Sequence, residues 1–248
     1  ENCLDRHLKL KSNKVAIIWE PNNPKDETIK ITYKELHQKV SVFSNVLKSH
    51  GVKKGDRICL YMPMVPELAI ATLACARIGA IHSVVFAGFS AKALADRIND
   101  AKCNVLLTSD GQFRGEKQLC LKDIADEALL NCDSIKSCIV LKRTGEKISM
   151  KLKRDFWWHE EIQKVNSSCP VEVMDSEDPL FILYTSGSTG KPKGVQHHCG
   201  GYMVYAEYSF RNVFQYEEND IYWCTADIGW ITGHSYIVYG PLLAGATT

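Results

Sequence analysis

Short apolar runs alternate with segments of helical periodicity along most of the chain. The apolar runs predict strands at 15–19, 29–33, 57–62, 81–86, 103–108, 137–142, 180–184 and 221–226. Apolar residues spaced three to four apart predict helices that begin near residues 33, 66, 91, 121 and 199, with a further helix over 237–248. Strands that alternate with helices indicate an α/β fold, in which parallel-sheet subdomains are packed with helices.

Capping residues indicate where several of these helices begin and end. Thr32 and Glu35 have the spacing of a capping box, and Ser90 is a suitable N-cap for the segment AKALADRI. Pro66 suits a first helical turn, where its missing N–H would have no partner. Gly51 and Gly79 follow periodic segments, and we expect them to end the helices because glycine readily adopts a positive φ.

Residues 143–179 interrupt this alternation with lysines, a tryptophan pair and the polar stretch MDSEDP. We expect an irregular connection over this range, with one short helix near Phe156–Val165. A boundary between two sheets is the alternative interpretation. The connection separates a first α/β segment, residues 1–142, from residues 180–248, where the pattern restarts.

Composition excludes two classes of partner. Of the 248 residues, 45% are hydrophobic and 24% are charged, as in ordinary globular proteins. The 30 basic and 29 acidic side chains give a net charge of +1, so no global field would attract nucleic acid. No run approaches the roughly 18 uninterrupted apolar residues of a membrane-spanning helix. Any anion site must therefore be local.

The ten cysteines bear on the compartment and on metal binding. None forms a C-x-x-C pair and no signal peptide is visible, which favours a reducing compartment. We expect the cytoplasm, while the nucleus and the mitochondrion remain open. His197, His198 and Cys199 are adjacent but lack the spaced partners of a zinc site, so no metal site is predicted. The oligomeric state is not indicated.

One polar stretch, YTSGSTGKPKG at 184–194, follows the apolar run LFIL. Glycines let backbone N–H groups converge on an anion, while hydroxyls donate hydrogen bonds and lysines add positive charge. The stretch is neither a Walker A loop nor a dinucleotide fingerprint, because both require a different glycine spacing. The alternative is a plain polar surface loop. The residues predicted to bind phosphate are Thr185, Ser186, Gly187, Ser188, Thr189, Gly190, Lys191 and Lys193.

The decapeptide TSGSTGKPKG at 185–194 resembles the phosphate loop of the adenylate-forming superfamily, which includes acyl-CoA synthetases, luciferases and adenylation domains of peptide synthetases. The resemblance implies that the loop holds the β- and γ-phosphates of ATP while a carboxylate attacks the α-phosphate. The products would be an acyl-adenylate and pyrophosphate.

Longer segments resemble one branch of that superfamily, the acetyl-CoA synthetases. They are DIYWCTADIGWITGHSYIVYGPLLAGATT at 220–248, VVFAGFSAKALADRI at 84–98 and FWWHE at 156–160, and the resemblance runs essentially end to end. It implies part of the large N-terminal domain of the adenylate-forming fold. It also implies acetate, ATP with Mg²⁺, and CoA as small-molecule partners.

The resemblance also assigns a CoA surface. FAGF, residues 86–89, would form a shallow slot for the adenine of CoA, and Arg114 would stack on that ring or pair with the 3′-phosphate. Glu116 would be unfavourable beside a phosphate unless it turns away or holds Arg114. Solvated loop charges are the alternative for Arg114 and Lys117. The CoA residues so assigned are Phe86, Ala87, Gly88, Arg114, Gly115, Glu116, Lys117 and Thr232.

Trp230, Ile231 and Thr232 would line the acyl pocket, by the same resemblance. A second aliphatic residue in place of Thr232 is typical of propionyl-CoA synthetases, so this sequence favours acetate. One methylene is worth only about 1–3 kcal/mol in an apolar pocket. Trp230 could instead be a core residue, as could Trp223. For His234 we favour a structural or orienting role over a general base, since a carboxylate substrate is already ionised at pH 7.

We expect the chain to be a fragment of a longer protein, because both ends look cut. The family's adenine segment, acidic ribose ligand and C-terminal domain have no counterpart here, so the chain alone should be inactive. Three interpretations remain: part of an acetyl-CoA synthetase, part of a synthetase for propionate or another short acid, or a non-catalytic fragment that binds CoA or nucleotide. Asp227 would be a loop cap or a supporting anchor.

Overall fold

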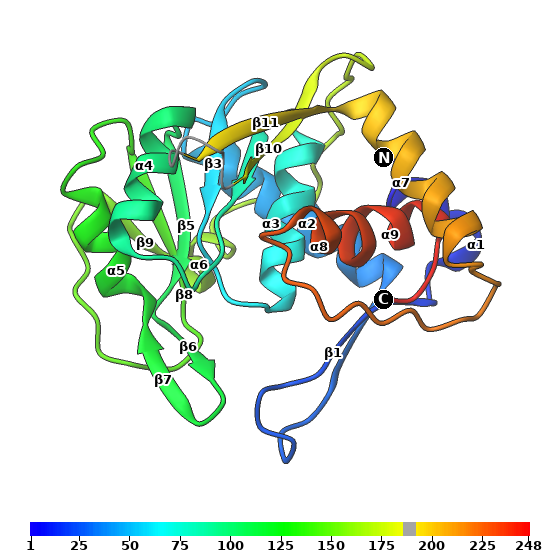
Figure 1. Cartoon of the computed structure of the whole chain (residues 1–248), viewed down its shortest axis with the longest axis horizontal. Helices are drawn as coiled ribbons and strands as arrows, with labels where there is room; N and C mark the ends of the chain where they lie inside the picture. The colour runs from blue at the N-terminus through cyan, green and yellow to red at the C-terminus, as the bar shows by residue number, and fades with distance from the viewer. Residues whose placement is uncertain (186–191) are drawn as a thin grey trace.

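The computed structural model describes residues 1–185 and 192–248. Within these residues, a seven-stranded sheet forms the centre of the fold, in the order β11-β10-β4-β3-β5-β8-β9 (Figure 1). Neighbouring strands are parallel except β10 and β11, which are antiparallel. The strands are β3 (Arg57–Leu60), β4 (Ile81–Val84), β5 (Val105–Ser109), β8 (Ser137–Leu141), β9 (Asp155–Trp157), β10 (Pro179–Thr185) and β11 (Lys193–His198).

Helices cover both faces of this sheet. Leu107 of β5 packs in one hydrophobic cluster with residues of α2 (Tyr33–Ser49) and α3 (Pro66–Arg77). Leu106, the preceding residue, packs in a second cluster with residues of α4 (Ala91–Ala101) and α5 (Leu121–Leu129). Successive side chains of a strand point to opposite faces, so a parallel sheet covered twice is apolar throughout. The predicted α/β class is confirmed.

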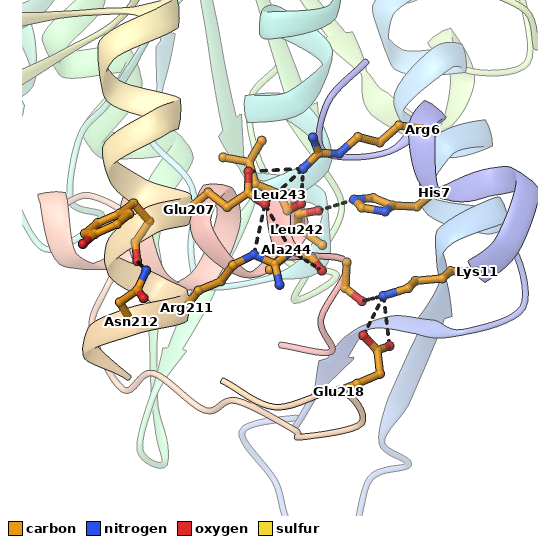
Figure 2. A network of polar contacts seen from close by, with 12 residues as sticks. Arg6, His7, Lys11, Glu207, Arg211, Asn212, Glu218, Leu242, Leu243 and Ala244 are labelled. Atoms are coloured by element: carbon orange, nitrogen blue, oxygen red, sulfur yellow. Dashed lines mark hydrogen bonds and ion pairs between the residues drawn. The ribbon is translucent and has the colours of Figure 1, made fainter. Parts of the chain in front are cut away.

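The C-terminal helices pack against the start of the chain (Figure 1). They are α7 (Cys199–Val213), α8 (Ile231–Gly233), the π-helix η2 (His234–Tyr239) and α9 (Gly240–Ala244). The chain begins with η1 (Asp5–His7) and α1 (Leu8–Lys11). Figure 2 shows Arg6 paired with Glu207 at 3.3 Å, and the ring of His7 bonded to the carbonyl oxygen of Leu242 at 2.9 Å. These bonds join the two ends of the chain.

Two antiparallel hairpins lie outside the central sheet and project toward the same side of the molecule in Figure 1. The first pairs β1 (Val15–Trp19) with β2 (Ile29–Thr32), and the second pairs β6 (Gly111–Arg114) with β7 (Lys117–Cys120). The Asn22 side chain donates a hydrogen bond to the carbonyl oxygen of Gly115 at 2.8 Å, so the tip of the second hairpin contacts the first.

The capping predictions are confirmed. The Thr32 hydroxyl accepts from the amide of Glu35, and the Glu35 carboxylate accepts from the amide of Thr32 at 2.8 Å. The Ser90 hydroxyl accepts from the amide of Ala93 at the start of α4. Gly51 and Gly79 have φ values of +81° and +69°, which glycine adopts without the clash of a Cβ.

The predicted strand at 221–226 is wrong. Only Ile221 forms a β-bridge, to Thr247, and the rest of the segment pairs with no strand among the described residues. The segment suggested a strand because β-branched and aromatic residues, which are enriched in strands, make up most of it. The Trp223 side chain is 84% exposed, which also rules out the core role considered for it.

Residues 143–179 do not divide two sheets. Asp155–Trp157 forms β9, which extends one edge of the central sheet, while β10 begins at Pro179 beside β4. The segment therefore runs from one edge of a single sheet back toward the other. Its helix, α6 (Trp158–Glu161), is shorter than predicted because β9 takes the preceding residues. The helix predicted over 237–248 also ends early, at Gly245, whose φ is +71°.

Candidate functional site

The predicted phosphate, CoA and hairpin segments all follow carboxyl ends of parallel strands in one sheet. β10 ends at Thr185, β4 ends just before Phe86, and β5 leads into the β6–β7 hairpin. In open α/β sheets, ligands bind in the crevice outside these strand ends. The topology therefore brings segments that are far apart in the sequence to the side of the sheet where the parallel strands have their carboxyl ends.

The phosphate-loop prediction lies partly within the described residues. Thr185 and Lys193 are exposed and face each other across the antiparallel pair of β10 and β11, so these strands hold both ends of the loop. The intervening predicted residues lie outside the described residues: Ser186, Gly187, Ser188, Thr189, Gly190 and Lys191.

The FAGF turn has one closed side and one open side. Ala87 is buried, and its carbonyl oxygen accepts a hydrogen bond from the Gln112 side chain at 2.9 Å. Gly88 is exposed, and a Cβ there would collide with the ring of Phe86. The Phe86 ring can lie over the backbone only because residue 88 has no side chain. A flat ligand ring would therefore meet Phe86 and Gly88 rather than Ala87.

Arg114 and Lys117 lie opposite each other at the tip of the β6–β7 hairpin, with Gly115 at a φ of +61° between them. Side chains of Gln112 and Arg114 share one hairpin face, since they are two residues apart on a strand. Gln112 contacts the FAGF turn, so this face, including Lys117, is the one turned toward the slot. All residues from 114 to 117 are exposed.

Glu116 forms no ion pair with Arg114 among the described residues, so the structure gives no support to the prediction that its carboxylate holds that guanidinium. It lies at the exposed tip of the hairpin, next to the turn residue Gly115. The remaining expectation is that its carboxylate turns away from a bound phosphate, because like charges repel.

The turn predicted to line the acyl pocket lies beside the FAGF turn. The Trp230 ring centroid is 6.1 Å from that of Phe86 and 6.2 Å from that of Phe89, and the Trp230 side chain is 48% exposed. Thr232 is exposed on α8, two residues after Trp230. Ile231, 45% exposed, lines an open cavity of about 400 Å³ with side chains that include Tyr202 and Ser235. The structure thus places Trp230, one of the predicted acyl residues, beside Phe86, one of the predicted CoA residues.

His234 is completely buried, which supports the structural role. Its Nδ1 donates to the carbonyl oxygen of Ile228. Its ring stacks on His82 with centroids 5.5 Å apart and lies tilted against Phe181 at 4.7 Å. Burial lowers the pKa of His234 to about 4, so the ring is neutral at physiological pH. Asp227 acts as a loop cap: its carboxylate accepts from the amide of Gly229 at 2.7 Å, and burial raises its pKa.

Sequence reasoning missed an arginine between the predicted sites. The Arg97 guanidinium lies 4.6 Å from the ring centroid of Phe89 and 5.5 Å from that of Tyr184, the residue before Thr185. Arg97 is only 8% exposed, and contact with aromatic faces compensates a buried guanidinium in part. Its position three residues after Leu94 in α4, on the apolar face of the helix, was the available signal.

The described residues contain no group of three or more histidine, cysteine, aspartate or glutamate side chains placed to hold a metal ion. No helix among them has the length and apolar character needed to cross a membrane. All ten cysteines have free thiols, and eight of those cysteines are buried.

The family model and the similar proteins that match this chain agree on one family. Residues 4–248 match the family model described as AMP-binding enzyme. The chain is 61% identical over 247 residues to acetyl-coenzyme A synthetase of Desulfatibacillum aliphaticivorans and 60% identical over 248 residues to that of Aeromonas salmonicida strain A449. Each match covers 100% of this chain but only 38% of the relative, so the chain spans well under half of their length. With its parallel sheet and the predicted site segments gathered at the strand ends, the chain belongs to the family of AMP-binding enzymes.

Proposed function

We propose that the full-length protein is an ATP-dependent ligase that makes acetyl-CoA from acetate and CoA through an acetyl-adenylate. The observation that carries this proposal is the identity of about 60% to proteins named acetyl-coenzyme A synthetase, maintained over the whole chain. The adjacency of the FAGF turn and Trp230 supports it, because an acyl group and the CoA that receives it must meet.

In the first step, an acetate oxygen attacks the α-phosphorus of ATP. The new bond is a mixed anhydride, the bond between the α-phosphorus and the bridging oxygen breaks, and pyrophosphate leaves. Thr185 and Lys193, at the two ends of the loop, would donate a hydrogen bond and a positive charge to the β- and γ-phosphates. This chemistry depends on positioning and on neutralising charge. Ser186, Gly187, Ser188, Thr189, Gly190 and Lys191 complete the proposed loop.

In the second step, the CoA thiol loses its proton to water and its sulfur attacks the acetyl carbonyl carbon. The bond between that carbon and the phosphate oxygen breaks, and AMP leaves. Phe86 and Gly88 would hold the adenine of CoA, while Arg114 and Lys117 would bind its phosphates. Thr232 would contact the pantetheine end, beside the acyl group at Trp230 and Ile231. Ala87, Gly115 and Glu116 complete the proposed CoA surface, with Ala87 acting through its buried backbone.

Mg²⁺ would enter as part of the ATP substrate, coordinated by phosphate oxygens, because the described residues offer no cluster of ligands for it. For the compartment we propose the cytoplasm, which is supported by the ten free thiols.

Acid-dependent exchange between ATP and labelled pyrophosphate tests the proposal on the full-length protein. Formate, acetate, propionate, butyrate and octanoate would be compared at equal concentration. We expect acetate to lead, because the resemblance associates a second aliphatic residue in place of Thr232 with propionate. A lead by a longer acid would retain the adenylate chemistry and refute acetate. No exchange with any acid, from a folded protein that still binds ATP, would favour a non-catalytic nucleotide-binding protein.

A further inference from the structure

We propose that Asp110 is a positioning residue for CoA. Its buried carboxylate fixes the root of the β6–β7 hairpin, which carries Arg114 and Lys117 at the tip. The inference rests on the proposed function, because it takes the hairpin to bind CoA. Asp110 itself would touch neither CoA nor any reacting atom.

The carboxylate of Asp110 gathers backbone donors from two segments. It is 0% exposed. Its oxygens accept from the amides of Gly111, Arg143 and Gly145, each at 2.7 Å, and from the amide of Thr144 at 3.0 Å. One side chain thereby joins the first residue of β6 to the turn that follows β8.

The main chain of Asp110 makes the same connections. Its amide donates to the carbonyl oxygen of Leu141, the last residue of β8, at 2.9 Å, and its carbonyl oxygen accepts from the amide of Leu121 at 3.2 Å. Leu121 directly follows β7, and Gly111 is paired with Cys120 across the hairpin. Both strands of the hairpin, β6 and β7, are therefore connected at their base to Asp110.

Position 110 requires a carboxylate, because the four backbone groups that contact its oxygens are all hydrogen-bond donors. No ion pair within the described parts of the chain joins Asp110 to a cation, so its charge is compensated by the four backbone amides. Asparagine has the same shape but would turn an NH₂ group against backbone N–H groups. The substitution would therefore loosen the root without removing any group that could contact CoA.

A change at the root would be felt at the tip. β6 runs from Gly111 to Arg114, which at about 3.3 Å per residue places the tip roughly 10 Å from the root. The contact of Gln112 with the carbonyl oxygen of Ala87 sets how the hairpin meets the FAGF turn. A small tilt would displace Arg114 and Lys117 relative to the FAGF turn without changing β10.

The test compares Asp110→Asn with Asp133→Asn in the full-length protein. Asp133 is exposed in the loop before β8, so its variant controls for the loss of one negative charge. Two quantities would be measured. They are the rate of ATP–pyrophosphate exchange with acetate in the absence of CoA, and the KM for CoA in the complete reaction. We expect Asp110→Asn to raise the KM for CoA about tenfold or more, because small misplacements of binding groups have large effects. In Asp110→Asn, the rate of ATP–pyrophosphate exchange should stay within about twofold of the unsubstituted protein. Asp133→Asn should change neither this rate nor the KM for CoA.

A second pair of variants addresses the same root if Asp110→Asn does not fold. Gly145 has a φ of +77°, with open space where a Cβ would lie. Gly145→Val strains this turn, whereas Gly145→Asn tolerates the left-handed conformation and serves as the control. Gly145→Val should raise the KM for CoA and Gly145→Asn should not.

The outcomes separate the inference from the function on which it rests. If Arg114→Ala and Lys117→Ala leave the KM for CoA unchanged, the hairpin does not bind CoA and the proposed CoA surface fails. If they raise it while Asp110→Asn and Gly145→Val do not, only the role of Asp110 is refuted. Equal losses of exchange and of CoA-dependent turnover would mean that Asp110 merely stabilises the fold, which also overturns the inference.

Discussion

Two buried titratable side chains, Lys122 and His234, differ in how many polar partners they have. The Lys122 side chain is 0% exposed and pairs with Asp126 at 2.6 Å and with Asp155 at 2.8 Å. Burial by itself would lower the pKa of Lys122, but these carboxylates outweigh it and raise the pKa. By contrast, Nε2 of His234 is buried and has no hydrogen-bond partner among the described residues. The first site should stabilise the fold through charge, and the second should make its stability sensitive to pH.

Lys122→Met should lower the free energy of unfolding by about 3 kcal/mol, because it leaves the buried carboxylate of Asp155 short of a partner. The matched control is Lys92→Met, which removes an exposed ion pair with Asp96 and should cost less than about 1 kcal/mol. Urea unfolding of the 248-residue chain measures both. Equal effects of the two substitutions would contradict the role of the buried network.

His234 predicts a fall in stability with acid. Its pKa is about 4 in the folded state and about 6.5 in the unfolded chain, so below pH 6.5 the unfolded state binds a proton that the folded state refuses. The stability present above pH 6.5 is therefore lost as the pH falls toward 4, by about 3 kcal/mol. His234→Asn should flatten that part of the curve of unfolding free energy against pH. His159→Asn, at an exposed position, is the control.

At the scale of elements, the helical segments followed the sequence pattern more closely than the strands did. Helices α2, α3, α4, α5 and α7 begin within one residue of where capping and periodicity place them, because those signals act within one turn. Strands need partners from elsewhere in the chain. The segment 221–226 has strand-like residues but no partner, while β9 and β11 were not predicted and pair with existing edges.

The N-terminal segment should control the stability of the C-terminal helices. Arg6 pairs with Glu207 of α7 and donates to the carbonyl oxygen of Leu243 of α9 (Figure 2). Arg6→Ala should therefore increase amide hydrogen exchange in α9 by severalfold relative to β5, because local opening no longer breaks these bonds. Lys9→Ala, at an exposed residue, is the control and should leave exchange in α9 unchanged. Equal exchange in both variants would show that the contacts of Arg6 do not limit the opening of α9.

At the scale of the whole molecule, the chain forms a sheet with both faces covered, yet it spans 38% of the length of its relatives. Three predicted site segments follow the carboxyl ends of β4, β5 and β10, and several predicted site residues are exposed, including Trp230, Ile231 and Thr232. Exposed residues of an acyl pocket would need further protein to exclude water from the adenylate. This geometry argues that the 248 residues are insufficient for the complete reaction.

We therefore expect the isolated 248-residue chain to show no acetate-dependent formation of AMP, while the full-length protein is active. The measurement is AMP release with acetate, ATP and CoA, at equal molar concentrations of the two proteins. Circular dichroism and a cooperative urea transition would establish that the isolated chain is folded. Turnover by the folded chain near the full-length rate would refute the expectation.

The sequence by itself determined the α/β class and the helix caps, because these signals lie in neighbouring residues. Its resemblance to a known family proposed the candidate site residues. Only the tertiary structure decided that β9 and β10 share one sheet, that Ala87 turns inward while Gly88 stays open, and that Trp230 lies beside Phe86. It also decided that Asp110 joins β6 to the turn after β8. These are contacts between segments that are far apart in the sequence. Their energies depend on strand pairing, burial and the neighbouring side chains, and no local pattern of residues encodes them.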